Sequence, residues 1–388
     1  MSDSAGVDLA PILQILLAGV AVAAVALGWL QLRARRQSPA HWLRALTVLT
    51  LFLTFDLVLF GAFTRLSDSG LGCPDWPGCY GNASPMGAKA DISAAQAAMP
   101  DGPVTHHKAW IEMVHRYMAT GVGALILILT VAGWRQWRRN PMRASQVHPW
   151  WPTFTLVWVC VQGAFGALTV TMKLFPAIVT MHLLGGLLLL ALLTIQAQKQ
   201  GQGVSGTLPV ALDGRTRFLL WLTATLLALQ LALGGWVSTN YAVLVCSDFP
   251  TCQGNWWPTM RFDQGFEVWR ALGMTADGGL VSFAALTAIH YTHRLMAYLV
   301  LVVLWVSAWR LSRIEGLRSQ ARWMGALAAL QLASGLGNVV LGWPLVAALL
   351  HTGGAAALVV VMTWTLSASR STQARYAAMG NMAIGGLR

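Results

Sequence analysis

Four histidines of this chain form two sets with the same order and similar spacing. The first set has His115 in a Glu-x-x-His-Arg segment and a lone His182 that opens an apolar run. The second set has His293 in a His-x-x-His-Arg segment and His351 at the start of another apolar run. Both sets lie in membrane-length segments, where an imidazole is costly and usually functional. Paired imidazoles without thiolate or carboxylate ligands suit haem iron, so we predict two buried haem sites.

Glu112 is the main difference between the two sets. It lies one helical turn before His115 on the same face, whereas His290 holds that place before His293. A carboxylate inside a membrane segment is costly and needs a reason. The asymmetry favours one reactive site near Glu112 and one site that only holds a cofactor. The alternative is that Glu112 simply pairs with Arg116.

Arginines and glycines flank the histidines of both sets. Arg116 and Arg294 directly follow the first histidine of each set, where they could bind haem propionates or reach out to lipid headgroups. Small residues one turn beyond the second histidine allow either a flat ligand or another helix to approach closely. These small residues are Gly185 and Gly186 in the first set and Gly353 and Gly354 in the second.

A Cys-x5-Cys segment precedes each set. Cys73 and Cys79 come before the first, and Cys246 and Cys252 before the second. On the outer side of a bacterial inner membrane thiols are oxidised, so we predict two local disulfides, Cys73–Cys79 and Cys246–Cys252. A metal site in each segment and pairing between the two segments are the alternatives. Cys160 stands alone in an apolar run, and we expect it to be a packing residue.

The composition is that of a polytopic membrane protein. The chain has 388 residues, of which 56% are apolar and only 10% charged, and its mean hydropathy is +0.57. Nine apolar stretches are each long enough to span a bilayer as a helix. They cover about 9–32, 43–64, 110–133, 151–172, 175–197, 217–239, 285–309, 322–342 and 345–367.

Basic residues alternate along the chain in a way that indicates topology. Of the 26 lysines and arginines, 18 lie in clusters at alternate helix ends, which we assign to the cytoplasm. Most acidic residues lie in the opposite loops and the N-terminal tail, so the N-terminus is expected in the periplasm and the C-terminus in the cytoplasm. The net charge of +12 is thus a topology signal, and we expect no nucleic-acid partner. The first apolar run follows acidic residues and precedes basic ones, which favours an anchor helix over a cleaved signal peptide.

The repeated motifs predict an internal repeat. We expect an all-α polytopic membrane protein of two pseudo-symmetric four-helix bundles, an eight-helix core, with one extra N-terminal transmembrane helix. The predicted parts are an N-terminal helix and basic linker (1–42), a first four-helix half (43–197), a cytoplasmic linker (198–216), a second four-helix half (217–367) and a cytoplasmic tail (368–388).

Several motifs resemble those of the haem A synthase family over about 43–367. They are the GAFTRLSDSGLGCPDWPGC segment from Gly61 to Cys79, the Glu-x-x-His-Arg segment at Glu112 and the GWVSTN segment at Gly235. The resemblance implies an inner-membrane enzyme that oxidises a ring methyl of haem O to the formyl group of haem A for terminal oxidases. The extra N-terminal helix departs from the family pattern.

The resemblance also implies a role for each histidine pair. Glu112, His115 and His182 would form the reactive site for the substrate, haem O, and His293 and His351 would ligate the iron of a haem b. An electron donor that the sequence does not identify would be required. Haem O synthase and oxidase assembly factors are candidate partners beside membrane lipid, and a homo-oligomer is left open.

Two other functions share the predicted haem sites. His115 lies about five residues and His182 about seven residues inside the outer ends of their predicted spans, and His293 and His351 lie at similar depths. A di-haem b electron carrier across the bilayer would instead require haems at two depths. A haem transporter or chaperone would need sites without chemistry, which Glu112 in one half only disfavours. Both functions remain as alternatives at this point.

Overall fold

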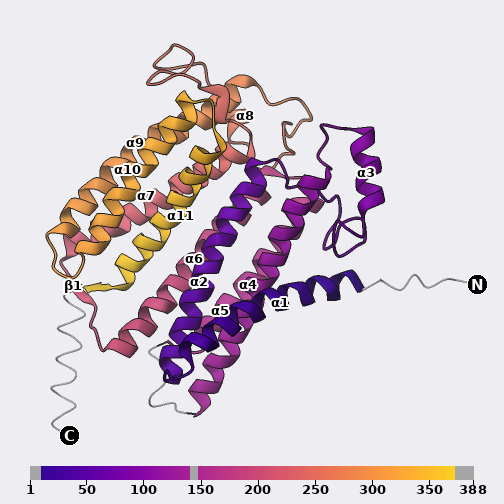
Figure 1. The fold of residues 1–388 in the computed structure, drawn as a ribbon. Coiled ribbons are helices and arrows are strands. Elements are labelled where there is room, and N and C mark those ends of the chain that lie inside the picture. The colour runs from indigo at the N-terminus through magenta and orange to yellow at the C-terminus, as the bar shows by residue number, and fades with distance from the viewer. Residues whose placement is uncertain (1–9, 140–146, 372–388) are drawn as a thin grey trace, which may run out of the picture. The chain divides into compact units, whose positions relative to one another are not determined.

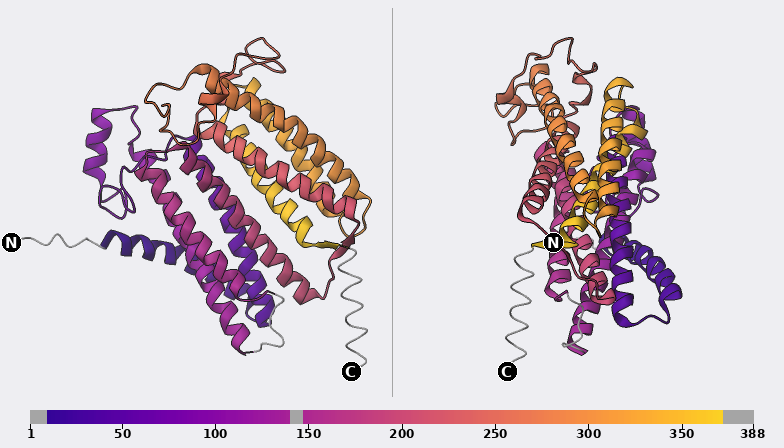
Figure 2. Two further views of the ribbon diagram at one scale, coloured as in Figure 1. Left: turned by 180° about the vertical axis from the view of Figure 1, so that it is seen from behind. Right: turned by 90° about the vertical axis from the view of Figure 1, so that its left-hand side faces the viewer.

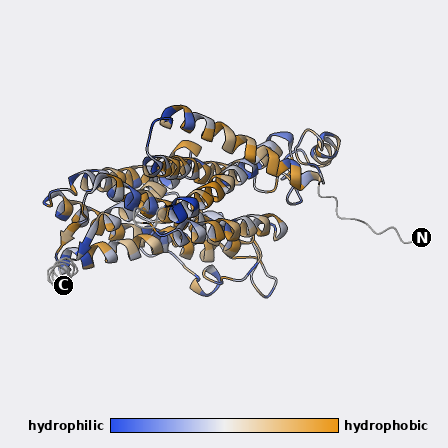
Figure 3. Ribbon diagram, turned by 90° about the horizontal axis from the view of Figure 1, so that it is seen from below, coloured by the Kyte–Doolittle hydropathy of each residue, from blue (hydrophilic) through white to orange (hydrophobic). Residues whose placement is uncertain are grey.

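The computed structural model describes residues 10–139 and 147–371 of the chain, and its membrane-length elements are helices (Figure 1). Within these residues nine helices are long and apolar enough to cross a membrane, which confirms the predicted spans and indicates a multi-pass membrane protein. Figure 3 shows hydrophobic colour along most of their length. They are α1 (Ala10–Ala34), α2 (Pro39–Leu66), α4 (His106–Arg139), α5 (Trp150–Thr171), α6 (Pro176–Ser205), α7 (Gly214–Thr239), α9 (Phe283–Ser312), α10 (Arg318–Val340) and α11 (Leu345–Ser367).

Short elements fill the segments between these helices. The first long loop contains α3 (Lys89–Ala98), and the second contains η2 (Val243–Val245) and α8 (Phe262–Gly265). Strand β1 (Val210–Leu212) pairs in parallel with β2 (Ser369–Ser371), and the sequence analysis predicted neither strand.

The segment expected to be a linker is fully described, whereas the segment expected to be a tail is described only at its beginning. In the segment 198–216, α6 continues to Ser205 and β1 follows. Glutamine is a good helix former, and the glutamine-rich end of α6 contains no proline. Most of the predicted tail, 372–388, lies outside the described residues. So do several charges used for the topology, namely Asp3, Asp8, Arg143, Arg375 and Arg388.

The described chain divides into two compact units. The first unit comprises residues 10–139 and 149–182, and the second comprises 147–148 and 183–371. The division falls inside α6, directly after His182. Each unit therefore holds one complete histidine pair, His115 with His182 and His293 with His351.

Local sequence signals explain where several helices begin. Ser38 caps α2, with Pro39 in its first turn, and the side chains of Asp213 and Ser282 accept hydrogen bonds at the starts of α7 and α9. Pro176 opens α6 and Pro344 precedes α11, the two helices that carry the second histidine of each pair. These signals place both second histidines about two turns inside their helices.

Helix α4 is the centre of the first unit. It packs against α1, α2 and α5, and α3 lies against its beginning. Helix α1 crosses α4 at a steep angle, and the crossing is close because Gly19 faces Thr120 (Figures 1 and 2). The apolar core shared by α1, α2 and α4 includes Ala23, Leu30, Leu43, Leu46, Leu125 and Leu129.

Helix α9 has the corresponding place in the second unit. It packs against α7, α8 and α10, while α11 packs against α10 and α7 (Figure 1). The core of this unit includes Leu220, Leu227, Leu304, Leu311, Met324 and Leu358. Both first histidines, His115 and His293, thus lie on the most surrounded helix of their unit.

Polar side chains inside the helices mostly find partners in their own unit. The hydroxyls of Thr47, Thr50 and Thr54 donate to the carbonyl one turn earlier on α2. In the second unit the hydroxyls of Thr223 and Ser307 are 2.7 Å apart. The buried Nδ1 atoms of His115 and His182, in contrast, have no side-chain hydrogen-bond partner within the described residues.

Candidate functional site

The first histidine pair comes from two helices of one unit. His115 lies on α4 and His182 on α6, close enough for their imidazoles to interact electrostatically. His115 lies against Gly61 of α2, where a β-carbon would be 2.9 Å from the imidazole Cε1. His182 lies against Gly166 of α5, with a corresponding distance of 3.4 Å.

The second pair repeats this arrangement. The ring centroids of His293 on α9 and His351 on α11 are 6.5 Å apart, and the rings are nearly perpendicular at 81°. A β-carbon on Gly234 of α7 would be 3.0 Å from Cε1 of His293, and one on Gly335 of α10 would be 3.2 Å from Cε1 of His351. Each of the four imidazoles therefore lies against a glycine on the preceding long helix.

The motif that begins at Gly61 was identified from the sequence, but the contact of each of these four glycines with a histidine ring was not predicted. Glycines one turn beyond each second histidine were expected instead to let a flat ligand or a helix approach. One of these, Gly354, makes room for the side chain of Gln331, so helix packing rather than a flat ligand explains it. The signal that could have found the right glycines is their repeated position, Gly61 and Gly234 before each disulfide loop.

The second pair has room for one metal ion between its imidazoles. The ring centroids of His293 and His351 are 6.5 Å apart, a separation at which one ion could bind a nitrogen of each ring at a distance of about 2 Å. Among the described residues no group of three or more His, Cys, Asp or Glu side chains could hold a metal ion. The donor set is therefore a pair of imidazoles, which suits a metal whose other ligands come from a macrocycle.

Hydrogen bonding separates the two pairs. In the second pair Nδ1 of His293 is 3.0 Å from Nε2 of Gln230, and Nδ1 of His351 is 3.0 Å from Oγ of Ser334. In the first pair the buried Nδ1 atoms of His115 and His182 have no side-chain partner within the described residues, and the imidazole of His182 interacts with the backbone of Gln162.

Glu112 is buried and bound on both carboxylate oxygens. Its Oε2 accepts a hydrogen bond of 2.9 Å from the backbone N–H of Cys73, and its Oε1 pairs with Arg116. The exposed fraction of Glu112 is only 4%. The pairing with Arg116, left open by the sequence, is thus present. It also links the histidine-bearing helix to the disulfide loop.

His290 occupies the same place in the second unit. Its Nδ1 is 2.9 Å from the carbonyl oxygen of Ala242, and its Nε2 accepts from Arg294 at 3.2 Å. Like Glu112, His290 thus joins the arginine one turn later to a neighbouring loop segment. The two units share this connection, but only the first builds it with a carboxylate.

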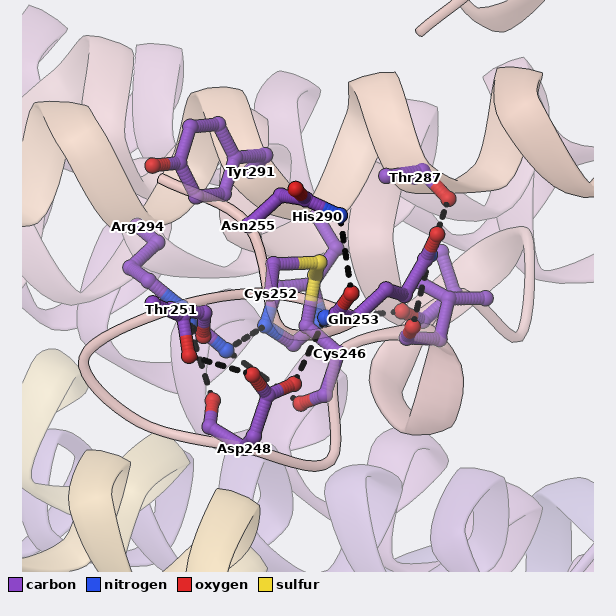
Figure 4. Close-up of a disulfide and its surroundings, with 12 residues drawn as sticks. Cys246, Asp248, Thr251, Cys252, Gln253, Asn255, Thr287, His290, Tyr291 and Arg294 are labelled. Carbon is purple, nitrogen blue, oxygen red and sulfur yellow. Dashed lines mark hydrogen bonds between the residues drawn. A yellow bond between two sulfur atoms is a disulfide. The ribbon is translucent and has the colours of Figure 1, made fainter. Parts of the chain in front are cut away.

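Both arginines hold the loop that contains the disulfide. Nη1 of Arg116 donates to the carbonyls of Asp75, Pro77 and Gly78, at distances of 2.6 to 3.0 Å. Arg294 donates to the carbonyls of Cys246, Asp248 and Thr251 (Figure 4). Their observed partners are therefore loop carbonyls and the residue one turn earlier.

The two disulfide loops have matching internal bonds. Cys73 is joined to Cys79 and Cys246 to Cys252, the local pairing that the sequence favours. Asp75 accepts the N–H groups of Tyr80 and Gly81, and Asp248 accepts those of Gln253 and Gly254. The hydroxyl of Thr251 and these N–H groups lower the pKa of Asp248 to about 2.

Two residues of α2, Phe60 and Asp56, were not identified from the sequence as neighbours of the helix turn that contacts His115. The ring of Phe60 stacks on His115, with centroids 6.3 Å apart and an angle of 8° between the planes. Asp56 lies one turn before Phe60 and is an acid within a membrane-length helix.

The expectation for Cys160 was wrong, because this residue, predicted to pack inside, is exposed on α5. In a membrane-length helix such a side chain can face lipid.

Known proteins match nearly the whole chain. Residues 44–363 match the COX15-CtaA family, described as cytochrome oxidase assembly proteins. The chain is 35% identical to the haem A synthase of Shewanella oneidensis over 337 residues, which cover 83% of this chain and 97% of that protein. It is 28% identical to the haem A synthase of Caulobacter vibrioides over 364 residues, 86% and 96% of the two chains. It is 26% identical to that of Halalkalibacterium halodurans over 318 residues, 80% and 89%.

Proposed function

The chain belongs to the COX15-CtaA family of cytochrome oxidase assembly proteins, and we propose that it is a haem A synthase. Such an enzyme oxidises a ring methyl of haem O to the formyl group of haem A. The observation that carries the proposal is the pair of histidine sites, one in each unit, within a chain that covers 97% of a haem A synthase at 35% identity. Helix α1 lies outside the family match.

His293 and His351 are proposed to hold a haem b. Their ring separation of 6.5 Å supports this proposal, because both imidazoles could bind one iron placed between them. A haem held there would supply electron transfer. The protein groups around it would fix the two imidazoles, since each ring has a glycine on one side and a hydrogen-bond partner at Nδ1.

His115 and His182 are proposed to bind the substrate, haem O. Glu112, one turn from His115, would be the catalytic carboxylate. A carboxylate beside a substrate carbon that loses electrons can stabilise developing positive charge or accept a proton. The Cys73 N–H and Arg116 hold the two oxygens of Glu112 in place, so the group would be oriented before the substrate binds. Arg116 and Arg294 remain proposed contacts of haem propionates, in addition to the loop contacts described above.

The proposed location is a bacterial inner membrane, with the N-terminus in the periplasm and the C-terminus in the cytoplasm. The placement of 18 of 26 lysines and arginines at alternate helix ends supports this topology. The disulfide loops would then face the oxidising periplasm. An electron donor, haem O synthase and oxidase assembly factors are the proposed partners.

Pigment extraction after expression together with a haem O synthase tests the function. The proposal predicts that haem O is converted to haem A only in cells that also express this chain. A di-haem electron carrier or a haem transporter would bind haem and leave haem O unchanged. Unconverted haem O beside a well-expressed, haem-loaded protein would therefore contradict the proposal.

A further inference from the structure

Corresponding positions around the two histidine pairs can be matched through the glycines that face the rings. Gln230 lies one turn before Gly234, which faces His293, and Leu57 lies one turn before Gly61 in the first unit. Gly335, which faces His351, corresponds in the same way to Gly166, which faces His182. The residue directly before each of these glycines is Ser334 in the second unit and Phe165 in the first.

Ser334 determines which nitrogen of His351 carries the proton. The hydroxyl of Ser334 donates its one hydrogen to the carbonyl oxygen of Leu330, at 2.7 Å. Toward Nδ1 of His351, 3.0 Å away, the hydroxyl oxygen can then only accept. Nδ1 therefore carries the proton, and Nε2 keeps the lone pair that a metal ion needs.

Gln230 holds His293 from the neighbouring helix. Its Nε2 donates to the backbone carbonyl oxygen of His293 at 3.2 Å and lies 3.0 Å from Nδ1 of the ring. One amide group therefore contacts both the backbone and the imidazole of His293 and fixes the orientation of the ring.

A third contact completes this support. Nε2 of Gln331 donates to the backbone carbonyl of His351 at 2.9 Å, and the absence of a side chain on Gly354 gives Gln331 its space. The second pair is thus supported by three polar side chains from α7 and α10, the helices that precede its histidine helices.

The first pair lacks this support. Leu57 and Phe165 have no group that could hydrogen bond to an imidazole. Gln162 corresponds to Gln331, but its buried amide has no partner within the part of the chain that the structure describes. The buried Nδ1 atoms of His115 and His182 likewise have no side-chain partner among these residues, although the backbone of Gln162 contacts His182 as the backbone of Gln331 contacts His351. The two units therefore match in their histidines and glycines and differ in the groups behind the rings.

We propose that Ser334 and Gln230 are positioning residues that fix the second histidine pair for a permanently bound haem, whereas Leu57 and Phe165 leave the first pair loosely held so that haem can exchange. The inference rests on the proposed function. A partner that accepts the second imidazole proton orients a ligand and makes it more basic, and its loss typically costs about 10- to 100-fold in metal affinity. A substrate site needs the opposite property, because its haem must leave after each reaction.

The test compares purified Ser334→Ala, Gln230→Leu and the double variant with the wild type. We expect each single variant to hold haem b about 10- to 100-fold more weakly. For Ser334→Ala we also expect the midpoint potential to rise, because a less basic imidazole stabilises the oxidised iron less. Ser334→Thr, which keeps the hydroxyl, should restore both properties. Ser307→Ala is the matched control, since it removes another buried serine hydroxyl of the same unit.

The reciprocal variants test the first pair. Leu57→Gln and Phe165→Ser should slow the release of haem from His115 and His182, measured by transfer to a haem-binding acceptor protein. Wild-type haem retention and potential in the double variant, with unchanged release in the reciprocal variants, would overturn the inference. If the wild type instead carries no low-spin haem that depends on His293 and His351, the proposed function fails as well.

Discussion

The two histidine pairs share one architecture and differ in how their rings are supported. In both units the first histidine lies on the central helix and each ring lies against a glycine. The side chains of Gln230 and Ser334 lie at hydrogen-bond distance from His293 and His351, whereas the Nδ1 atoms of His115 and His182 have no side-chain partner within the described residues. The comparison shows that an internal repeat can preserve the positions of its histidines and glycines while the side chains that contact the histidine rings differ between the two units.

The position one turn before the first histidine shows the same division. Glu112 and His290 both bind the arginine that follows one turn later, and both reach a neighbouring loop. The structural role of the position is therefore common to the two units. Only Glu112 adds a carboxylate, so chemistry that requires a carboxylate is expected in the first unit alone.

The largest expected effect comes from exchanging the residue types at this position. Glu112→His introduces the second unit's residue into the first and should keep the link to Arg116. We expect haem A formation to fall by about 100-fold or more, because the carboxylate is lost. Haem O, or a hydroxylated intermediate, should accumulate while haem b content stays normal, as measured by extraction and chromatography. Glu112→Gln retains an acceptor for the Cys73 N–H but removes the negative charge, so it distinguishes the role of Glu112 in holding the disulfide loop from the role of its charge.

Normal haem A yield from a well-expressed Glu112→His or Glu112→Gln variant would remove the catalytic role. Glu112 would then be only a link between α4 and the disulfide loop. Loss of both haem b and protein would instead show that Glu112 acts mainly in folding.

The glycines should give the next largest effect. A β-carbon at Gly61 would come within 2.9 Å of the His115 ring and one at Gly234 within 3.0 Å of the His293 ring. We expect Gly61→Ala to impair haem A formation and Gly234→Ala to lower haem b content, each through overpacking that typically costs about 1–3 kcal/mol. Gly166→Ala is the matched control, because its β-carbon would be 3.4 Å from His182, an ordinary contact. Equal effects of Gly61→Ala and Gly166→Ala would contradict this.

Removing either disulfide should lower stability by a smaller amount, and the two removals should differ in their effect on haem A formation. For loops this short, loss of a disulfide is expected to cost about 2 kcal/mol of unfolding free energy. Serine in place of Cys73 and Cys79, or of Cys246 and Cys252, should lower the Tm similarly. Only the first change should also reduce haem A formation per folded molecule, because the Cys73 N–H binds Glu112. Equal losses of specific activity in both variants would argue against that distinction.

The smallest effect concerns acid stability of the second loop. Asp248 has its pKa lowered to about 2 from an ordinary value of 3.8, chiefly by the hydroxyl of Thr251 and the N–H of Gly254. Its stabilising contribution is therefore full above the ordinary value and is lost as the pH falls toward about 2. The protection of the Gln253 and Gly254 amides against hydrogen exchange, relative to the intrinsic rate at each pH, should decrease over that interval. Asp248→Asn should abolish this pH dependence, and a variant that retains it would show that another group titrates.

Much of this arrangement could be predicted from local sequence spacing. Long apolar runs define the nine spans, and Pro176 and Pro344 mark the starts of the helices that carry His182 and His351. The Cys-x5-Cys spacing favours local disulfides. Helix ends were less predictable, because α4 begins at His106, before its apolar run. An apolar run indicates which residues lie in the membrane, but a helix can extend beyond that run into polar residues, so the run does not define the ends of the helix.

Contacts between helices distant in the sequence could not be predicted. The repeated position of Gly61 and Gly234 before each disulfide loop marks them as a pair, but it does not show that each faces a histidine on another helix. The same is true of Ser334, whose hydroxyl becomes meaningful only beside Nδ1 of His351. Arg116 was expected to meet propionates, yet a chain segment 38 to 41 residues away supplies the carbonyls it binds. Such contacts depend on tertiary packing, which one sequence does not reveal.

The division of labour between the two pairs is tested most directly by one pigment analysis. His182→Ala and His351→Ala would each be expressed with a haem O synthase, purified, and analysed for bound haem b, haem O and haem A together with the low-spin spectrum. The account predicts that His182→Ala keeps low-spin haem b and forms no haem A, whereas His351→Ala loses the low-spin haem b itself. Loss of the same pigment in the same proportion from both variants would contradict it.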